Sequence, residues 1–196
     1  YDLQEVTVSR AERSRPSRLP YVLGLLVLAA AVVAVWSGGV PEQAIAVIEA
    51  PGFEATTLEG DPVELGDYAG KVVLLNIWAT GCAPCLQEMP SIQRLHERID
   101  DPDFRIVAVS VDAAVEGERG YLNFVGGNVP QWVERLGLTF DVLRDPSGEV
   151  GDIYDVTGLP ESFLIGRDGR IYRRLAGATE WDAQAYVEQI ERLLDA

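Results

Sequence analysis

The sequence predicts an α/β domain in which strands and helices alternate and pack in layers. Two apolar runs, at residues 71–78 and 104–111, have the near-continuous hydrophobicity of strands that are covered on both faces. Between them, Met89 and Ile92 begin a series of apolar residues at helical spacing, which indicates a helix over about residues 83–99. A predicted hairpin and a last helix close the chain, so the class is α/β with a buried central sheet.

A β-hairpin is expected before the first buried strand. Residues 53–58 and 62–65 have the pattern of short strands, and they flank Glu59, Gly60 and Asp61. Glycine supplies the backbone freedom that a tight turn needs. We expect this hairpin to be an N-terminal extension of the domain.

Shorter elements are expected after the second buried strand. Residues 112–128 form an irregular stretch that contains four glycines. Thr179 and Asp182 are spaced as in a capping box, so Thr179 is the expected N-cap of the last helix. The other expected elements are a helix at 129–136, a strand at 140–143, a helix at 148–154 and an antiparallel hairpin at 163–165 and 171–175.

An uncharged segment precedes the domain. Residues 19–40 are apolar and long enough for a helix that spans a bilayer, which takes about 20 residues. The positive-inside rule places the preceding end in the cytoplasm and the domain outside it. This orientation depends on four arginines before the segment, at Arg10, Arg13, Arg15 and Arg18.

The expected organisation is therefore a cytoplasmic tail at 1–18, a single transmembrane anchor at 19–40, a linker at 41–50 and the α/β domain at 51–196. A cleaved signal peptide is the alternative, because the same arginines resemble its positively charged start. Its apolar part is usually shorter, and no clear cleavage site follows residue 36.

The net charge of the chain is −15. The acidic residues lie mainly after the apolar segment, since residues 1–18 contain four arginines against three acidic residues. Such an acidic domain repels nucleic acid and anionic lipid surfaces. We therefore expect no nucleic-acid partner.

The only two cysteines, Cys82 and Cys85, lie where the first buried strand is followed by the helix. Pro84 suits a first helical turn, and the helix N-terminus favours the thiolate form of Cys82. Cys85, one turn further on, can then resolve a mixed disulfide. The pair predicts a redox-active dithiol, in agreement with a location outside the cytoplasm, where disulfides persist.

Other uses of the pair fit less well. A structural disulfide that closes so short a loop would add little stability. A zinc site needs about four nitrogen or sulfur ligands, and His96 is the single histidine. A peroxidase is disfavoured because Leu75 and Ala79 stand where its Pro-x-x-x-Thr-x-x-Cys motif requires proline and threonine. We expect no metal and no cofactor apart from the Cys82–Cys85 disulfide.

Three blocks of sequence occur in the order of a known family. They are residues 50–53, residues 70–85 and residues 154–165. Together they resemble the thioredoxin fold and, more narrowly, the membrane-anchored thiol–disulfide oxidoreductases of the TlpA, ResA and CcmG/DsbE group. The likeness covers about residues 48–196.

The resemblance implies roles for individual residues. Cys82 corresponds to the attacking cysteine, Cys85 to the resolving cysteine and Pro160 to a cis-proline opposite them. Glu88 corresponds to a glutamate that assists proton transfer, although its position alone would equally suit a solvated helix glutamate. Asn76 stands where cytosolic thioredoxins carry a buried aspartate, which gives Glu88 more weight.

The resemblance also implies a substrate-binding surface, with the following members: Trp78, Gly81, Gly158, Leu159 and Glu161. Glu161 could instead be an exposed carboxylate at a strand end. Gly81 departs from the family, in which a tryptophan usually precedes the first cysteine, so we expect Cys82 to be more open. Residues 112–128 are expected to be an ordinary variable loop, with a partner-recognition insertion as the alternative.

The leading hypothesis is a membrane-tethered reductase of protein disulfides with its catalytic domain outside the cytoplasm. By resemblance, its substrate is the oxidised haem-attachment cysteine pair of apocytochrome c, and a membrane thiol donor supplies electrons. One alternative is another redox target, such as the cysteines of a respiratory copper centre. Another is a non-catalytic thioredoxin-like subunit of a membrane complex.

Overall fold

The computed structural model describes residues 48–196, so the expected tail, the anchor and most of the linker lie outside the described residues. None of the helices within residues 48–196 combines the length and the hydrophobicity of a membrane span. The elements are β1 (Ile48–Glu49), β2 (Glu54–Thr56), β3 (Pro62–Glu64), η1 (Leu65–Tyr68), β4 (Val72–Trp78), α2 (Ala83–Arg98), β5 (Phe104–Ser110), η2 (Tyr121–Asn123), α3 (Val129–Leu136), β6 (Asp141–Arg144), α4 (Glu149–Ile153), β7 (Glu161–Ile165), β8 (Arg170–Ala176) and α5 (Gln184–Leu194).

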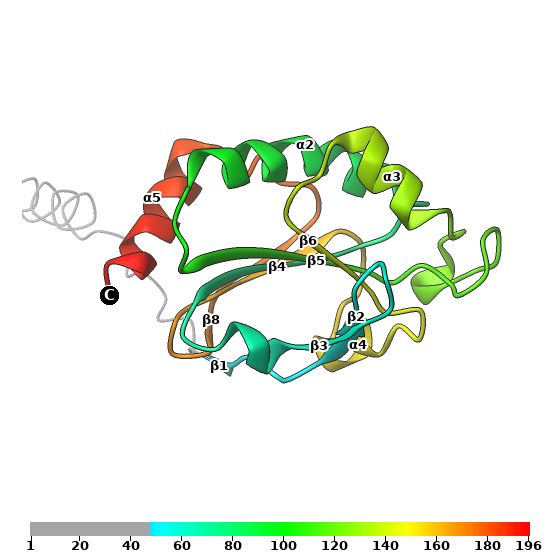
Figure 1. Cartoon of the computed structure of the whole chain (residues 1–196), viewed down its shortest axis with the longest axis horizontal. Coiled ribbons are helices and arrows are strands. Elements are labelled where there is room, and N and C mark those ends of the chain that lie inside the picture. Colours follow the sequence, from blue (N-terminus) through cyan, green and yellow to red (C-terminus); the bar gives the residue numbers. More distant parts are fainter. Residues whose placement is uncertain (1–47) are drawn as a thin grey trace, which may run out of the picture. The chain divides into compact units, whose positions relative to one another are not determined.

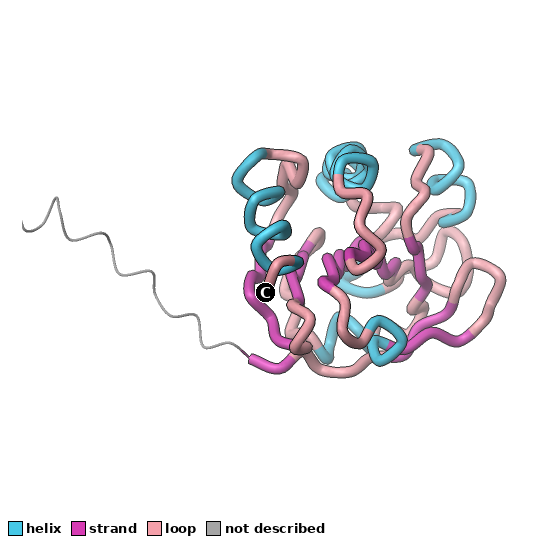
Figure 2. Tube along the Cα trace, turned by 60° about the vertical axis from the view of Figure 1, so that its left-hand side comes forward, coloured by secondary structure: helices cyan, strands magenta, loops and turns pink. Residues whose placement is uncertain are grey.

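One sheet organises the described domain, with strand order β1-β8-β7-β4-β5-β6-β2-β3. Helices α2, α3 and α5 lie over one face of this sheet, and the short helices η1 and α4 lie on the other (Figures 1 and 2). The predicted α/β class is therefore confirmed, with the sheet between two layers.

Strand β4 lies at the centre of the sheet. It pairs in parallel with β5 and antiparallel with β7, and all seven of its residues are buried. This burial agrees with the continuous apolar run, because a strand covered on both faces has no solvent side on which to place polar residues. The two predicted buried strands are confirmed.

Helix α2 begins directly after β4 and the short turn that follows it. Cys82 is its N-cap and Pro84 lies in its first turn. The apolar residues that predicted this helix, Met89 and Ile92, are fully buried toward the core. The fold thus places both cysteines at the end of the central strand and the beginning of a helix.

The two outer edges of the sheet were predicted with different success. The N-terminal hairpin is confirmed, since β2 pairs antiparallel with β3, and it joins the sheet where Thr56 pairs with Arg144 of β6. The linker prediction is wrong at residues 48–49, because Ile48 pairs with Ile171 of β8. The open edge of β8 offers unpaired backbone groups that such a segment can satisfy.

The last helix begins later than the capping pattern predicted. The hairpin of β7 and β8 is confirmed, but α5 starts at Gln184 with Ala183 as N-cap. The Thr179 hydroxyl donates to the carbonyl oxygen of Gly177 (3.3 Å), and Asp182 binds Arg94 of α2. The predicted cap is therefore wrong, because its two polar residues are engaged in other contacts.

Candidate active site

The two cysteines form a disulfide at the N-terminus of α2, with their Cα atoms 5.3 Å apart. The backbone N–H of Cys85 donates to Cys82 Sγ at 3.2 Å. In the reduced protein the same N–H and the positive end of the helix dipole would favour a thiolate at Cys82. The predicted arrangement of a helix-capping cysteine and a second cysteine one turn later is confirmed.

Cys82 is not open to solvent. Both cysteines are fully buried, although Gly81, Ala83 and Pro84 around them are exposed. A Cβ atom at Gly81 would lie 2.3 Å from the carbonyl oxygen of Val125. The expectation of a more open Cys82 is therefore wrong, because a later segment runs over the space that a side chain at position 81 would occupy.

Residues 113–128, which we call the insertion loop, form that segment. Within it, Arg119 and Val125 make an isolated β-bridge, and the N–H of Gly126 donates to the carbonyl oxygen of Glu118 (2.9 Å). The loop therefore folds back on itself as a small hairpin beside the disulfide.

Asp112 joins the insertion loop to the segment before Cys82. Its buried carboxylate accepts hydrogen bonds from the backbone N–H of Thr80 (2.9 Å), from the Thr80 hydroxyl and from the N–H of Gly127 (3.2 Å). Sequence reasoning missed this residue, and its only signal was an acidic residue directly after a buried strand. Asp112 thus ties the backbone directly before Gly81 to the insertion loop.

The Leu159–Pro160 peptide bond is cis. Pro160 directly precedes β7, in which Glu161 pairs with Ile77 of β4. Because of this register, Pro160 lies next to the C-terminal end of β4, and the chain runs from that end to Cys82. The structure thus brings together the two sequence blocks that predicted the site, with Gly158 exposed and Leu159 only 9% exposed beside them.

Glu88 lies one turn after Cys85 on α2 and is only 2% exposed. The indole Nε1–H of Trp181 donates to Glu88 Oε1, whereas no donor within residues 48–196 reaches Glu88 Oε2. Burial raises the pKa of Glu88 to about 7. Hydrogen bonds to the carboxylate, the largest of them from Trp181, lower the pKa and offset only part of this rise. A solvated helix glutamate is therefore excluded, and the carboxyl can exchange a proton near neutral pH.

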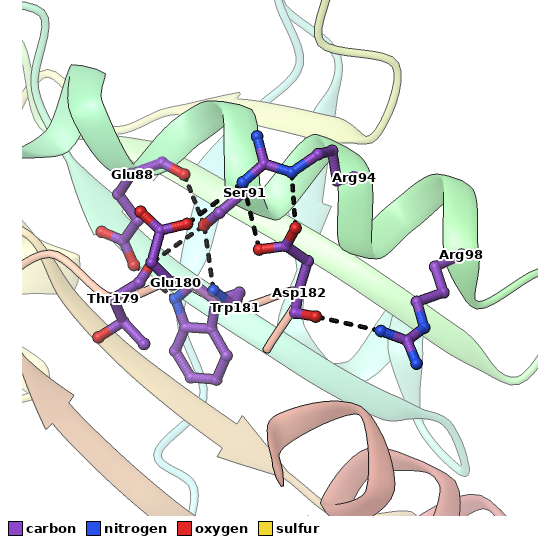
Figure 3. Close-up of polar contacts among 8 residues, drawn as sticks. All are labelled: Glu88, Ser91, Arg94, Arg98, Thr179, Glu180, Trp181 and Asp182. Atoms are coloured by element: carbon purple, nitrogen blue, oxygen red, sulfur yellow. Dashed lines mark hydrogen bonds and ion pairs between the residues drawn. The ribbon is translucent and has the colours of Figure 1, made fainter. Parts of the chain in front are cut away.

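A set of contacts holds Trp181 against α2 (Figure 3). Ser91 Oγ accepts from the backbone N–H of Trp181 (3.1 Å) and donates to the carbonyl oxygen of Thr179 (3.0 Å). Arg94 pairs with Asp182 at 2.6 Å, and this hydrogen bond keeps the pKa of Asp182 below its ordinary value. The segment after β8 is thereby attached to α2, which fixes the indole next to Glu88.

Trp181 was missed by sequence reasoning. The capping pattern predicted that it lay in the first turn of the last helix, where nothing would connect it with α2. It is instead fully buried and contacts a residue 93 positions earlier in the chain. Only the tertiary structure reveals such a contact.

Asn76 has the buried position that the resemblance implied. It is fully buried in β4, and its side-chain amide donates to Ser162 Oγ (2.9 Å). A neutral amide at this position cannot take the proton of a cysteine. Glu88 is therefore the carboxylate that α2 places near the disulfide.

Two predicted substrate-binding residues do not reach the surface. Trp78 is fully buried in β4, and Glu161 is 2% exposed and pairs with Arg174. Arg174 also donates to the carbonyl oxygen of Asp155 (2.7 Å). The prediction is wrong for both residues, because β4 is covered on both faces and because Arg174 neutralises Glu161 inside the protein. The alternative of an exposed carboxylate at Glu161 is wrong as well.

Comparison with known proteins agrees with this geometry. A model of the AhpC/TSA family matches residues 48–174. ResA of Geobacillus thermodenitrificans (strain NG80-2), a thiol-disulfide oxidoreductase, is 34% identical over 173 residues, which cover 87% of this chain and 93% of the relative. ResA of Bacillus thuringiensis subsp. konkukian (strain 97-27) is 36% identical over 143 residues, which cover 72% of this chain and 76% of the relative.

A solved structure with the same fold comes from Chlorobium tepidum and is described as a thiol:disulfide interchange protein DsbE. It superposes with a TM-score of 0.64 at 31% identity, over 76% of this chain and 96% of that one. The shared sequence, the shared fold and the Cys82–Cys85 disulfide at the start of α2 agree. The chain belongs to the AhpC/TSA family of thioredoxin-like proteins, among the ResA- and DsbE-like thiol–disulfide oxidoreductases.

Proposed function

We propose that this oxidoreductase is a membrane-tethered reductase of protein disulfides outside the cytoplasm, and that its substrate is the oxidised cysteine pair of apocytochrome c. The observation that carries the exchange mechanism is the buried Glu88, with a pKa of about 7 and one free oxygen, one turn after Cys85. A resolving cysteine needs a nearby base of this kind to lose its proton.

Reduction proceeds in two thiol–disulfide exchanges. The Cys82 thiolate attacks one sulfur of the substrate disulfide, so that a mixed disulfide forms and the other substrate sulfur leaves as a thiolate. The Cys85 thiol then gives its proton to Glu88 and attacks Cys82 Sγ. This step forms the Cys82–Cys85 disulfide and releases the second substrate sulfur, so two electrons have passed to the substrate.

The two oxygens of Glu88 have different tasks in this mechanism. Oε1 is held by the indole of Trp181, which fixes the orientation of the carboxyl group. Oε2 is the oxygen open to a proton from Cys85, and it can return that proton to the departing sulfur. A group whose pKa lies near the working pH is the most effective general acid and base. An external dithiol then reduces the disulfide for the next cycle.

Three features support the substrate and the location. The haem-attachment segment of a c-type cytochrome has the pattern Cys-x-x-Cys-His, and its two cysteines can become oxidised outside the cytoplasm. The strongly acidic chain attracts basic partners. The uncharged residues 19–40, with four arginines before them, suit a single anchor that leaves the catalytic domain outside.

The direction of the reaction can be tested with the full-length chain in detergent. Pre-reduced protein is mixed with an oxidised synthetic peptide that contains Cys-x-x-Cys-His, and mass spectrometry counts the peptide thiols. We expect stoichiometric reduction by the wild type and none by Cys82→Ser. Oxidation of the reduced peptide instead, or a potential near that of strong oxidants at about −120 mV, would contradict a reductase.

The substrate can be identified by trapping. A full-length Cys85→Ser variant cannot resolve the mixed disulfide, so bound partners stay attached until a reductant is added. We expect a cytochrome c precursor among them, and none with the Cys82→Ser/Cys85→Ser control. Recovery of copper-centre proteins alone would overturn the assignment to apocytochrome c.

A further inference from the structure

The insertion loop contacts both halves of the active site, the side of the disulfide and the side of the cis-proline. On the side of the disulfide, the Val125 carbonyl lies on Gly81, and Asp112 holds the N–H of Gly127. On the side of the cis-proline, the Tyr121 hydroxyl donates to the carbonyl oxygen of Val156 (2.9 Å). The loop therefore bridges the segments that precede Cys82 and Pro160.

Glycines allow the insertion loop and the rest of the domain to approach this closely. A Cβ atom at Gly148 or Gly151, in or next to α4, would lie 2.7 or 2.6 Å from the ring of Tyr121. A Cβ atom at Gly127 would lie 2.7 Å from the Thr80 hydroxyl. Such close approach is open only to residues without a side chain. The loop is thus fitted to the domain rather than loosely attached to it.

The insertion loop presents apolar side chains to solvent. Of the four large apolar residues exposed within residues 48–196, three belong to it: Val115 at 55%, Leu122 at 39% and Val125 at 49%. The fourth, Ile48, lies in β1, which Figure 1 shows on the other side of the domain. Apolar groups concentrated on one exposed segment are characteristic of an interaction surface.

Leu122 also has a backbone conformation that its own side chain disfavours. Its φ is 53° and that of the following Asn123 is 62°. Residues with a branched or bulky side chain rarely adopt this left-handed region, whereas glycine and asparagine do so readily. Folding of the turn alone would favour another residue at position 122, which indicates that the exposed leucine serves a different purpose.

We infer that the insertion loop is a substrate-recognition surface, on which Leu122 and Val125 bind an apolar side chain next to the reacting cysteine of a polypeptide substrate. The inference rests on the proposed function and specifies its substrate. A polypeptide whose cysteine reaches Cys82 passes Gly81, and the loop lies directly on Gly81. Glu116 and Glu118 on the same loop would repel an anionic membrane surface and a second copy of this acidic chain.

Two synthetic peptides test this selectivity. Each has an intramolecular Cys-x-x-Cys disulfide, and they differ only in the residue before the first cysteine, which is leucine in one and serine in the other. The full-length chain, pre-reduced, is mixed with each peptide, and the second-order rate constants are measured. For the wild type we expect the leucine peptide to react about tenfold faster, the range typical of one buried apolar group.

The double variant Leu122→Asn/Val125→Thr removes the apolar surface while keeping residues that suit the backbone. We expect its preference for the leucine peptide to fall to about twofold or less. Ile48→Thr is the matched control, because it makes the same kind of change on β1, and it should keep the wild-type preference. Leu122→Asn alone should not lower the melting temperature, since asparagine tolerates a positive φ.

The outcomes distinguish failure of the recognition surface from failure of the proposed function. Equal rates for both peptides with the wild type, or an unchanged preference in the double variant, would overturn the recognition surface. Loss of the preference in Ile48→Thr would do so too. Reduction of the small disulfide cystamine, dependent on Cys82, tests the oxidoreductase chemistry separately. A wild type that reduces neither peptide nor cystamine would contradict the proposed function as well.

Discussion

The first turns of α2 and the insertion loop flank the same disulfide, but different contacts hold them in place. Around Glu88 the contacts are made by polar side chains of α2: Glu88 binds the indole of Trp181, Ser91 binds the backbone N–H of Trp181, and Arg94 pairs with Asp182. In the insertion loop they involve backbone groups, and glycines provide the space. The first region depends on polar side chains, whereas the second depends in addition on positions that lack a side chain.

We expect the two regions to have different roles, proton transfer near Glu88 and substrate choice at the insertion loop. In the proposed mechanism Glu88 takes the proton of Cys85 in every reaction cycle, so changes there should affect all substrates. The insertion loop lies on Gly81, next to Cys82, so changes there should affect the choice of substrate and the fit of the loop. Four predictions from three substitutions test this separation, from the largest expected effect to the smallest.

Glu88→Gln should have the largest effect. Without a base near Cys85, the rate of mixed-disulfide resolution should fall about a hundredfold for every disulfide substrate, a size typical of general acid–base catalysis. Stopped-flow decay of a mixed disulfide at Cys82 measures this rate between pH 6 and 8. Glu97→Gln, an exposed residue on the same helix, is the control. A loss confined to one substrate would place Glu88 in recognition rather than in proton transfer.

The same substitution should change the dependence of stability on pH. The pKa of Glu88 is raised from 4.5 to about 7 in the folded protein, so the folded state binds this proton more tightly than the unfolded chain does. The wild type therefore loses stability as pH rises from about 4.5 to 7, by about 3 kcal/mol at most. Glu88→Gln lacks this loss.

Urea unfolding at pH 4, 8 and 9 measures the effect. We expect Glu88→Gln to gain stability relative to the wild type as the pH rises, with little change between pH 8 and 9. A difference that is constant across the range would mean that the carboxyl titrates at its ordinary pH.

Gly81→Ala tests the fit of the insertion loop. The new Cβ atom would lie 2.3 Å from the Val125 carbonyl oxygen, so the backbone of the loop has to shift. Overpacking of this kind costs about 1–3 kcal/mol, which thermal unfolding would reveal as a lower melting temperature. Gly52→Ala is the matched control, because nothing lies within 4 Å of its Cβ position. Equal melting temperatures for the two variants would show that the loop does not press on Gly81.

Trp181→Phe should have the smallest effect. It removes the hydrogen bond that favours the charged form of Glu88, so the pKa of Glu88 rises further. Less carboxylate is then available below neutral pH, and resolution at pH 6.5 should slow by about threefold, the size expected for one hydrogen bond. The rate profile should move to higher pH, whereas Trp132→Phe, on α3, should leave it in place. A slower rate without this movement would indicate a purely structural role.

Much of the framework was predictable because local patterns determine it. The continuous apolar run of β4, the helical spacing of Met89 and Ile92, and the turn at Gly60 each report a structure formed by neighbouring residues. The cysteine pair was recognisable for the same reason, since one strand end and one helix start define it. Pro160 required the resemblance to a family, because sequence alone favours a trans bond before proline.

The parts that could not be predicted depend on contacts between distant segments. Thr179 and Asp182 have the spacing of a helix cap, but Arg94 on α2 recruits Asp182 and the helix starts later. The burial of Cys82 depends on the path of the insertion loop, which no single glycine in it reveals. Glu161 was misplaced because its partner, Arg174, lies on the neighbouring strand.

The proton exchange at Glu88 can be measured directly. The side-chain carboxyl carbon of Glu88, in the oxidised full-length chain, is followed by carbon-13 NMR between pH 4 and 9, and the signal is assigned by its absence in Glu88→Gln. We expect a titration midpoint at about pH 7, because burial raises the pKa of this carboxyl. A midpoint near 4.5 would contradict the role of Glu88 as the proton acceptor of Cys85.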